Sequence, residues 1–177
     1  VIHGKVEHIG TDAFYKTTAL ENIVVSEDNG MYKSVDGVLF DKDMTMLLCY
    51  TNGHDRKSYA IPDGVREVDD WAFAHCEAIE EIVIPDSVER IGFSAFENCF
   101  NVKEITIGSS LRFIEEYAFW NCDELEKVYY NGHSSVWDTV EVLHGNEGLL
   151  GAEFTFCTNE ELTEVEGSDA TCTEDGY

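Results

Sequence analysis

Residues 84–106 read IPDSVERIGFSAFENCFNVKEIT, and the segments on either side of them align with this stretch without a gap. Residues 61–83 read IPDGVREVDDWAFAHCEAIEEIV, and residues 107–129 read IGSSLRFIEEYAFWNCDELEKVY. Four columns are identical in all three units: Ile61/Ile84/Ile107, Ala72/Ala95/Ala118, Phe73/Phe96/Phe119 and Cys76/Cys99/Cys122. A constant period of this length predicts a solenoid, because one such unit buries its apolar face only against its neighbours.

Each unit contains the pattern of one strand and one tight return of the chain. Apolar residues alternate with others in Ile82-Val83-Ile84, as they do along a β-strand. Pro85-Asp86 then supplies a turn, and the Ala-Phe pair lies in a stretch that can form one or two turns of helix or 3₁₀ helix. We therefore expect an α/β solenoid with one short strand and one short helix or 3₁₀ turn per rung.

Outside these three units the chain departs from the period. Residues 2–24 form a weaker copy, in which Thr17 takes the place of the cysteine. Residues 25–60 interrupt the repeat with two predicted strands about a tight turn at Asp41-Lys42-Asp43, an inserted β-hairpin. These aspartates lack the further oxygen ligands and the glycine of a calcium loop, so a plain turn is favoured.

The C-terminal part divides into a cap and a tail. Residues 130–157 remain apolar but lose the spacing, which is typical of a unit that closes the end of a solenoid. Residues 158–177 hold seven acids and no base, the composition of a linker. We therefore expect a repeat domain over residues 1–157, followed by an acidic linker or the start of a truncated downstream module.

The repeat resembles the BspA-type leucine-rich repeat, whose 23-residue unit is roughly I-P-x-S-V-x-x-I-G-x-x-A-F-x-x-C-x-x-L-x-x-I-x. Residues 84–106 follow it almost completely, whereas Asp69 and Glu115 replace the glycine and Gly108 replaces the proline. The resemblance covers roughly residues 1–157 and implies a right-handed leucine-rich-repeat stack. It further implies a bacterial protein that is secreted or held at the cell surface, where several such proteins act as adhesins for host matrix proteins or other bacteria.

The charge of the chain restricts its partners. Asp and Glu number 36 against 11 Lys and Arg, a formal net charge of −25. Such a surface repels phosphate backbones and anionic lipids, so we expect neither nucleic acid nor direct membrane insertion. No apolar run is long enough to span a bilayer, and no secretory signal or anchor is recognised. A protein partner is expected to present a basic patch and to bind less tightly at high salt.

The sequence contains none of the common motifs of catalysis or cofactor binding. There is no C-x-x-C, H-E-x-x-H, G-x-S-x-G or glycine-rich phosphate loop, so we predict no enzyme and no cofactor. Carboxylate pairs are so frequent that none is singled out for glycosidase chemistry. Cys76, Cys99 and Cys122 share one column and are interpreted as small buried apolar residues rather than as a metal site.

Two sets of variable positions remain as candidate binding residues. On the strands, six side chains should point outward: Glu81, Val83, Glu104, Thr106, Lys127 and Tyr129. Elsewhere in the repeats, five aromatic residues occupy variable columns: Trp71, Phe93, Phe100, Tyr117 and Trp120. Exposed aromatic residues often mark interfaces, although both sets could simply pack between rungs. The expected function is a non-catalytic binding module for proteins, an adhesion module; the alternative is a carbohydrate-binding or spacer module.

Overall fold

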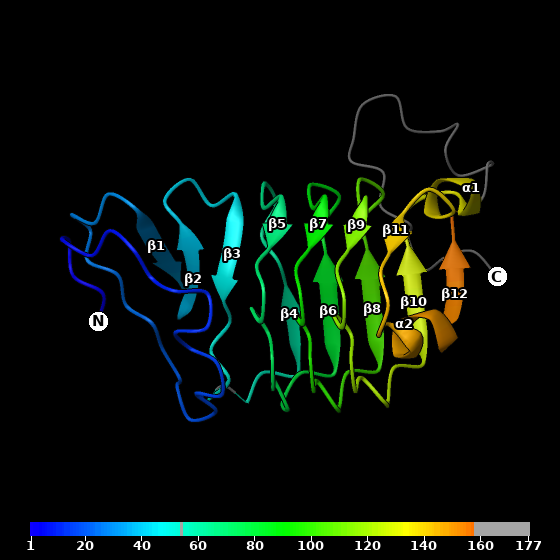
Figure 1. Cartoon of the computed structure of the whole chain (residues 1–177), viewed down its shortest axis with the longest axis horizontal. Coiled ribbons are helices and arrows are strands. Elements are labelled where there is room, and N and C mark those ends of the chain that lie inside the picture. Colours follow the sequence, from blue (N-terminus) through cyan, green and yellow to red (C-terminus); the bar gives the residue numbers. More distant parts are fainter. Residues whose placement is uncertain (54, 158–177) are drawn as a thin grey trace.

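Two sheets run side by side along the long axis of the molecule in the computed structural model (Figure 1), which describes residues 1–53 and 55–157. The five-stranded sheet is parallel throughout, and each strand pairs in register with the equivalent strand one unit away. Its order is β12-β10-β8-β6-β4, with β4 (Ser58–Ala60), β6 (Glu81–Ile84), β8 (Glu104–Ile107), β10 (Lys127–Tyr130) and β12 (Glu153–Phe156).

The other sheet has seven strands in the order β1-β2-β3-β5-β7-β9-β11. Its members are β1 (Tyr32–Val35), β2 (Val38–Asp41), β3 (Met46–Cys49), β5 (Glu67–Val68), β7 (Arg90–Ile91), β9 (Phe113–Ile114) and β11 (Glu141–Val142). From β3 to β11 the pairing is parallel. Each rung therefore contributes a strand to both sheets, and the predicted solenoid is a β-solenoid.

The prediction of a helix or 3₁₀ turn in every rung is not confirmed. The described helices, α1 (Ser134–Trp137) and α2 (Glu147–Gly151), both lie beyond the repeats. In the middle rung, Ser94 (φ 50°) and Asn98 (φ 59°) adopt left-handed backbone. As a result the N–H groups of Ser94, Phe96 and Asn98 donate to carbonyls of the next rung, at 2.7 to 3.1 Å. A helix would have directed these donors back along its own chain, so the α/β description is replaced by an all-β rung.

The invariant columns of the sequence form the core. The rings of Phe73, Phe96 and Phe119 are fully buried and stacked, with centroids 4.8 and 5.0 Å apart. Tyr50 extends this stack by one more rung, 5.0 Å from Phe73. Aliphatic side chains from both sheets surround the stack in a single apolar cluster: Val68, Ile82, Ile91, Ile105, Ile114 and Val128. Repetition of one small set of residues thus fills the space between the sheets.

Residues 32–49 form three antiparallel strands, not the two expected about one turn. The first turn contains Asp36 (φ 49°) and Gly37 (φ 85°), the pair of left-handed residues that a tight hairpin requires. At the second turn, Asp41 accepts hydrogen bonds from the backbone N–H groups of Thr45 and Met46, at 2.7 and 2.9 Å. Because β3 then pairs in parallel with β5, this segment continues the seven-stranded sheet.

The two ends of the solenoid differ in construction. At the N-terminal end, Ile2 and Val25 form an isolated parallel bridge, and Phe14 packs in a smaller apolar cluster around Ile23 and Leu39. At the other end, aromatic side chains of residues 130–157 cover the last rung. The ring centroid of Trp137 lies 4.7 Å from that of Phe154 and 5.2 Å from that of Tyr130. The linker or downstream module expected over residues 158–177 lies outside the described residues.

Candidate binding surfaces

The strand face, defined as the outward side chains of the five-stranded sheet, forms two rows across the rungs. One row runs Ser58, Glu81, Glu104, Lys127, Glu153, and the other runs Ala60, Val83, Thr106, Tyr129, Thr155. All six strand residues predicted from the sequence therefore lie together, in register, on neighbouring strands. Val83 is 43% exposed, and Tyr129 is partly exposed at the other side of Thr106.

Charged side chains of both signs lie along this face and its border. The Nζ atom of Lys127 lies 2.9 Å from Glu104, and Glu80 lies 2.8 Å from Lys57 and 3.6 Å from Lys103. The lysines lower the pKa of Glu80, and Glu104 raises the pKa of Lys127. Glu81 has no salt bridge within the described part of the chain. The face thus retains uncompensated negative charge beside a short apolar row.

A second surface, the aromatic ridge, is formed by ring side chains of successive turns. Trp71 contacts Phe93 (centroids 5.4 Å apart), and Phe93 contacts Tyr117 (5.9 Å), each pair edge to face. The ridge consists of Tyr15, Trp71, Phe93, Tyr117, Trp120 and His144. Packing between rungs accounts for part of it, but Tyr117 and Trp120 remain 36% and 45% exposed. Phe100 is also exposed and makes no ring contact among the described residues.

Two residues of the ridge have a costly backbone conformation. Trp71 (φ 55°) and Tyr117 (φ 58°) both lie in the left-handed region, where Gly, Asn and Asp are preferred. In the unit between them the same column holds Ser94. Bulky side chains in this region cost of the order of 1 kcal/mol each, and such outliers often occur at functional sites.

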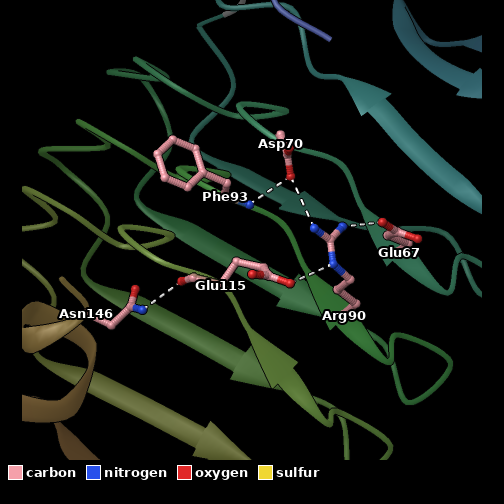
Figure 2. Close-up of polar contacts among 6 residues, drawn as sticks. All are labelled: Glu67, Asp70, Arg90, Phe93, Glu115 and Asn146. Atoms are coloured by element: carbon pink, nitrogen blue, oxygen red, sulfur yellow. Dashed lines mark hydrogen bonds and ion pairs between the residues drawn. The ribbon is translucent and has the colours of Figure 1, made fainter. Parts of the chain in front are cut away.

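Beside the ridge, Arg90 lies among three carboxylates (Figure 2). Its guanidinium bonds Glu67, Asp70 (3.3 Å) and Glu115 (3.1 Å). Asp70 also accepts the backbone N–H of Phe93 at 2.9 Å, so the charged cluster meets the backbone of a ridge residue whose ring points away from it in Figure 2. Sequence reasoning missed Arg90, because only the fold brings the acids of the two neighbouring rungs around it.

The cysteine column is buried and reduced. Cys76, Cys99 and Cys122 are free thiols, and the Sγ atom of Cys99 bonds the carbonyl of Phe73 at 3.2 Å. Burial raises the pKa of the Cys99 and Cys122 thiols well above the ordinary value. Across residues 1–53 and 55–157, no group of three or more His, Cys, Asp or Glu side chains is placed to hold a metal ion.

The column before the cysteines forms a polar ladder. Asn121 donates from Nδ2 to Oδ1 of Asn98 at 2.8 Å, and Nδ2 of Asn98 lies 3.4 Å from Nε2 of His75. These side chains bond each other because all three residues adopt left-handed backbone at the same place in the turn. His75 is a member of this ladder and has no nucleophile beside it in the described contacts.

Asn146 is a structural residue that sequence reasoning missed. It is buried, and its Oδ1 atom accepts the N–H of Phe119 at 2.9 Å, where earlier rungs use a carbonyl of the next rung. Its Nδ2 atom donates to the carbonyls of Glu115 and Leu143, both at 2.9 Å. The only sequence signal is an Asn after Gly145 in the unit that loses the period.

Comparison with known proteins settles the family. A protein-family model described as "BspA type Leucine rich repeat region (6 copies)" matches residues 48–139. The chain belongs to this family. BspA-type repeat proteins generally serve as surface and binding modules and are typically secreted or exposed at the cell surface. Among the residues that the structure describes, no helix is both long and apolar enough to cross a membrane. Comparison with curated proteins gave no match.

Solved structures show the same fold. The pneumococcal vaccine antigen PcpA is 24% identical, with a TM-score of 0.66 over 73% of this chain and 38% of that one. A leucine rich cell surface protein of Faecalibacterium prausnitzii is 26% identical, with a TM-score of 0.57 over 79% of this chain and 50% of that one. This BspA-type chain therefore spans half or less of the length of these two structures.

Proposed function

We propose that this BspA-type domain is an adhesion module outside the bacterial cell, which binds a protein partner through its strand face. The observation that carries the proposal is the register of the five-stranded sheet. It aligns the row of Val83, Thr106 and Tyr129 beside the row that contains Glu81 and Glu104. Val83 is exposed, and Thr106 and Tyr129 are partly exposed. Apolar and aromatic side chains with a polar border are typical of a protein interface.

The charge of the face suggests what kind of partner fits it. Lys127 is paired with Glu104, whereas Glu81 has no salt bridge among the described residues. The whole chain carries a formal net charge of −25. A partner with a basic patch would therefore be steered toward the domain, and its association would weaken as salt screens the charges.

The test is to probe the labelled domain against an array of extracellular matrix proteins, mucins and glycans at low and high salt. We expect a protein target whose binding weakens with salt. Glu81→Lys should abolish that binding, because it reverses a charge that has no salt bridge among the described residues and lies on the same strand as Val83. Glu141→Lys is the matched control, since Glu141 is an exposed acid of the other sheet.

Three results would contradict the proposal. Equal loss in both variants would indicate that only net charge matters and not the strand face. A glycan target that is insensitive to salt would favour the carbohydrate-binding alternative. If the domain bound nothing on the array, a spacer would be favoured, with the binding function elsewhere in a longer protein.

A further inference from the structure

The aromatic ridge lies in a strongly acidic setting. In Figure 2 one guanidinium, that of Arg90, faces the carboxylates of Glu67, Asp70 and Glu115. Three negative charges against one positive charge leave a local net charge of −2, which reaches the ridge at the backbone N–H of Phe93. The side chains of these acids are 27 to 29% exposed, so they remain accessible to a partner's cation.

Carboxylates also accompany the rest of the ridge. Near one end, Oε1 of Glu97 accepts hydrogen bonds from the Tyr15 hydroxyl (3.4 Å) and from Asn98 (3.0 Å). Near the other end, Glu116 directly precedes Tyr117 and takes part in no salt bridge among the described residues. The acids are thus spread along the row of rings over several rungs.

The ridge already receives one cation from its own chain. The Nζ atom of Lys16 lies 5.0 Å from the ring centroid of Tyr15. Within residues 1–53 and 55–157, no other lysine or arginine is placed over a ring. The exposed rings of Tyr117 and Trp120 are therefore open to a cation from outside.

We propose that the aromatic ridge is a second docking surface, separate from the strand face, which binds an arginine-rich segment of a partner protein. Arginine combines the two properties that the ridge requires. Its planar guanidinium stacks on aromatic faces, and its fork of N–H groups pairs with carboxylates. Guanidinium groups stack on Tyr117 and Trp120 while their N–H groups reach the acids beside these rings.

The geometry of the rings favours this ligand over a glycan. Neighbouring rings of the ridge stand nearly perpendicular, at 75° for Trp71 and Phe93, 78° for Phe93 and Tyr117, and 76° for Tyr117 and Trp120. They do not form the continuous flat platform on which successive sugar rings stack. An anionic glycan would be repelled by the acids, and a neutral one would not use them.

The experiment compares two fluorescent homopeptides of equal length, one of arginine and one of lysine, by anisotropy titration against the full chain. Any strongly acidic protein attracts both peptides, so the preference for arginine is the informative quantity. We expect the arginine peptide to bind about threefold or more tightly than the lysine peptide. Trp120→Ala should remove most of that preference, because it deletes a ring of the ridge that is more exposed than Tyr117, at 45% against 36%.

The control variant is Phe100→Ala, which removes a ring of comparable exposure, 39% against 45% for Trp120, that lies off the ridge. It should leave both affinities and the preference unchanged, and the urea midpoints of both variants should match that of the unmodified chain. Glu116→Gln should weaken arginine-peptide binding about twofold by removing a charge beside Tyr117. Equal affinity for the two peptides, or a preference that survives Trp120→Ala, would overturn the proposal. Its failure is distinct from that of the strand-face proposal, which is tested by Glu81→Lys.

Discussion

Asn146→Ala should destabilise the domain strongly, although Asn146 lies outside every repeat. The substitution removes three hydrogen bonds of 2.9 Å, one from Phe119 N–H to Oδ1 and two from Nδ2 to the carbonyls of Glu115 and Leu143. At about 1 kcal/mol for each net bond, the expected loss in the free energy of unfolding is about 3 kcal/mol. Domains of this kind are stable by roughly 5 to 15 kcal/mol, so this loss is large.

Urea denaturation followed by far-UV circular dichroism measures that loss, and amide hydrogen exchange locates it. The exchange of the Phe119 N–H should accelerate more than that of Phe96, whose N–H bonds the carbonyl of Ala118. Asn101→Ala is the control, because Asn101 is exposed and makes a single side-chain bond, to the carbonyl of Glu77. It should cost less than about 1 kcal/mol. Equal losses in the two variants, with unchanged protection at Phe119, would refute the idea that Asn146 replaces a missing rung.

Two further predictions concern charged and ionisable groups. Burial raises the pKa of the Cys49 thiol to about 12. The thiol therefore stays neutral in the folded state while the thiol of the unfolded chain ionises. As a result, the urea midpoint should decrease as the pH is raised from about 8 to about 10. Cys49→Ala should show a shallower fall, and an identical slope would contradict this assignment. Arg90→Met should lower the free energy of unfolding by about 1 kcal/mol, and more at low salt, because three carboxylates lose their shared partner. The control Arg112→Met removes a single contact of 4.0 Å and should have a smaller effect, with little salt dependence.

The sequence alone was sufficient to predict the solenoid, since its period of 23 residues fixes which side chains meet. Phe73 and Phe96 occupy one column because every rung needs the same large ring at the same depth, and the structure stacks them 4.8 Å apart. The path of the chain between the strands was not predictable in this way. Ala95-Phe96 is compatible with a helical turn, and only hydrogen bonds to the adjacent rung select the left-handed residues Ser94 and Asn98.

One candidate surface could likewise be predicted from the sequence, and the other could be predicted only in part. The strand face could be listed from the sequence, because alternation along a strand and a constant period together determine which residues face outward. The acids around Arg90 could not, because Glu67 and Asp70 come from the unit before that of Arg90, Glu115 comes from the unit after it, and the three occupy different columns. Tyr15 likewise belongs to the weak first copy, and its contact with Trp71 depends on how the N-terminal segment lies against the repeats.

Aromatic side chains in the left-handed column of the ridge make opposing contributions to stability. A bulky side chain there costs of the order of 1 kcal/mol, and an edge-to-face contact such as that of Phe93 with Tyr117 returns about 0.5 to 1.5 kcal/mol. The two effects nearly cancel, and the ring surface buried between the rungs adds further stability. Asparagine avoids the cost, as it does at Asn98 and Asn121 in the other left-handed column, where it also bonds its neighbours. Under the proposal that the ridge binds arginine, ligand recognition gives Trp71 and Tyr117 a second role that asparagine could not fill.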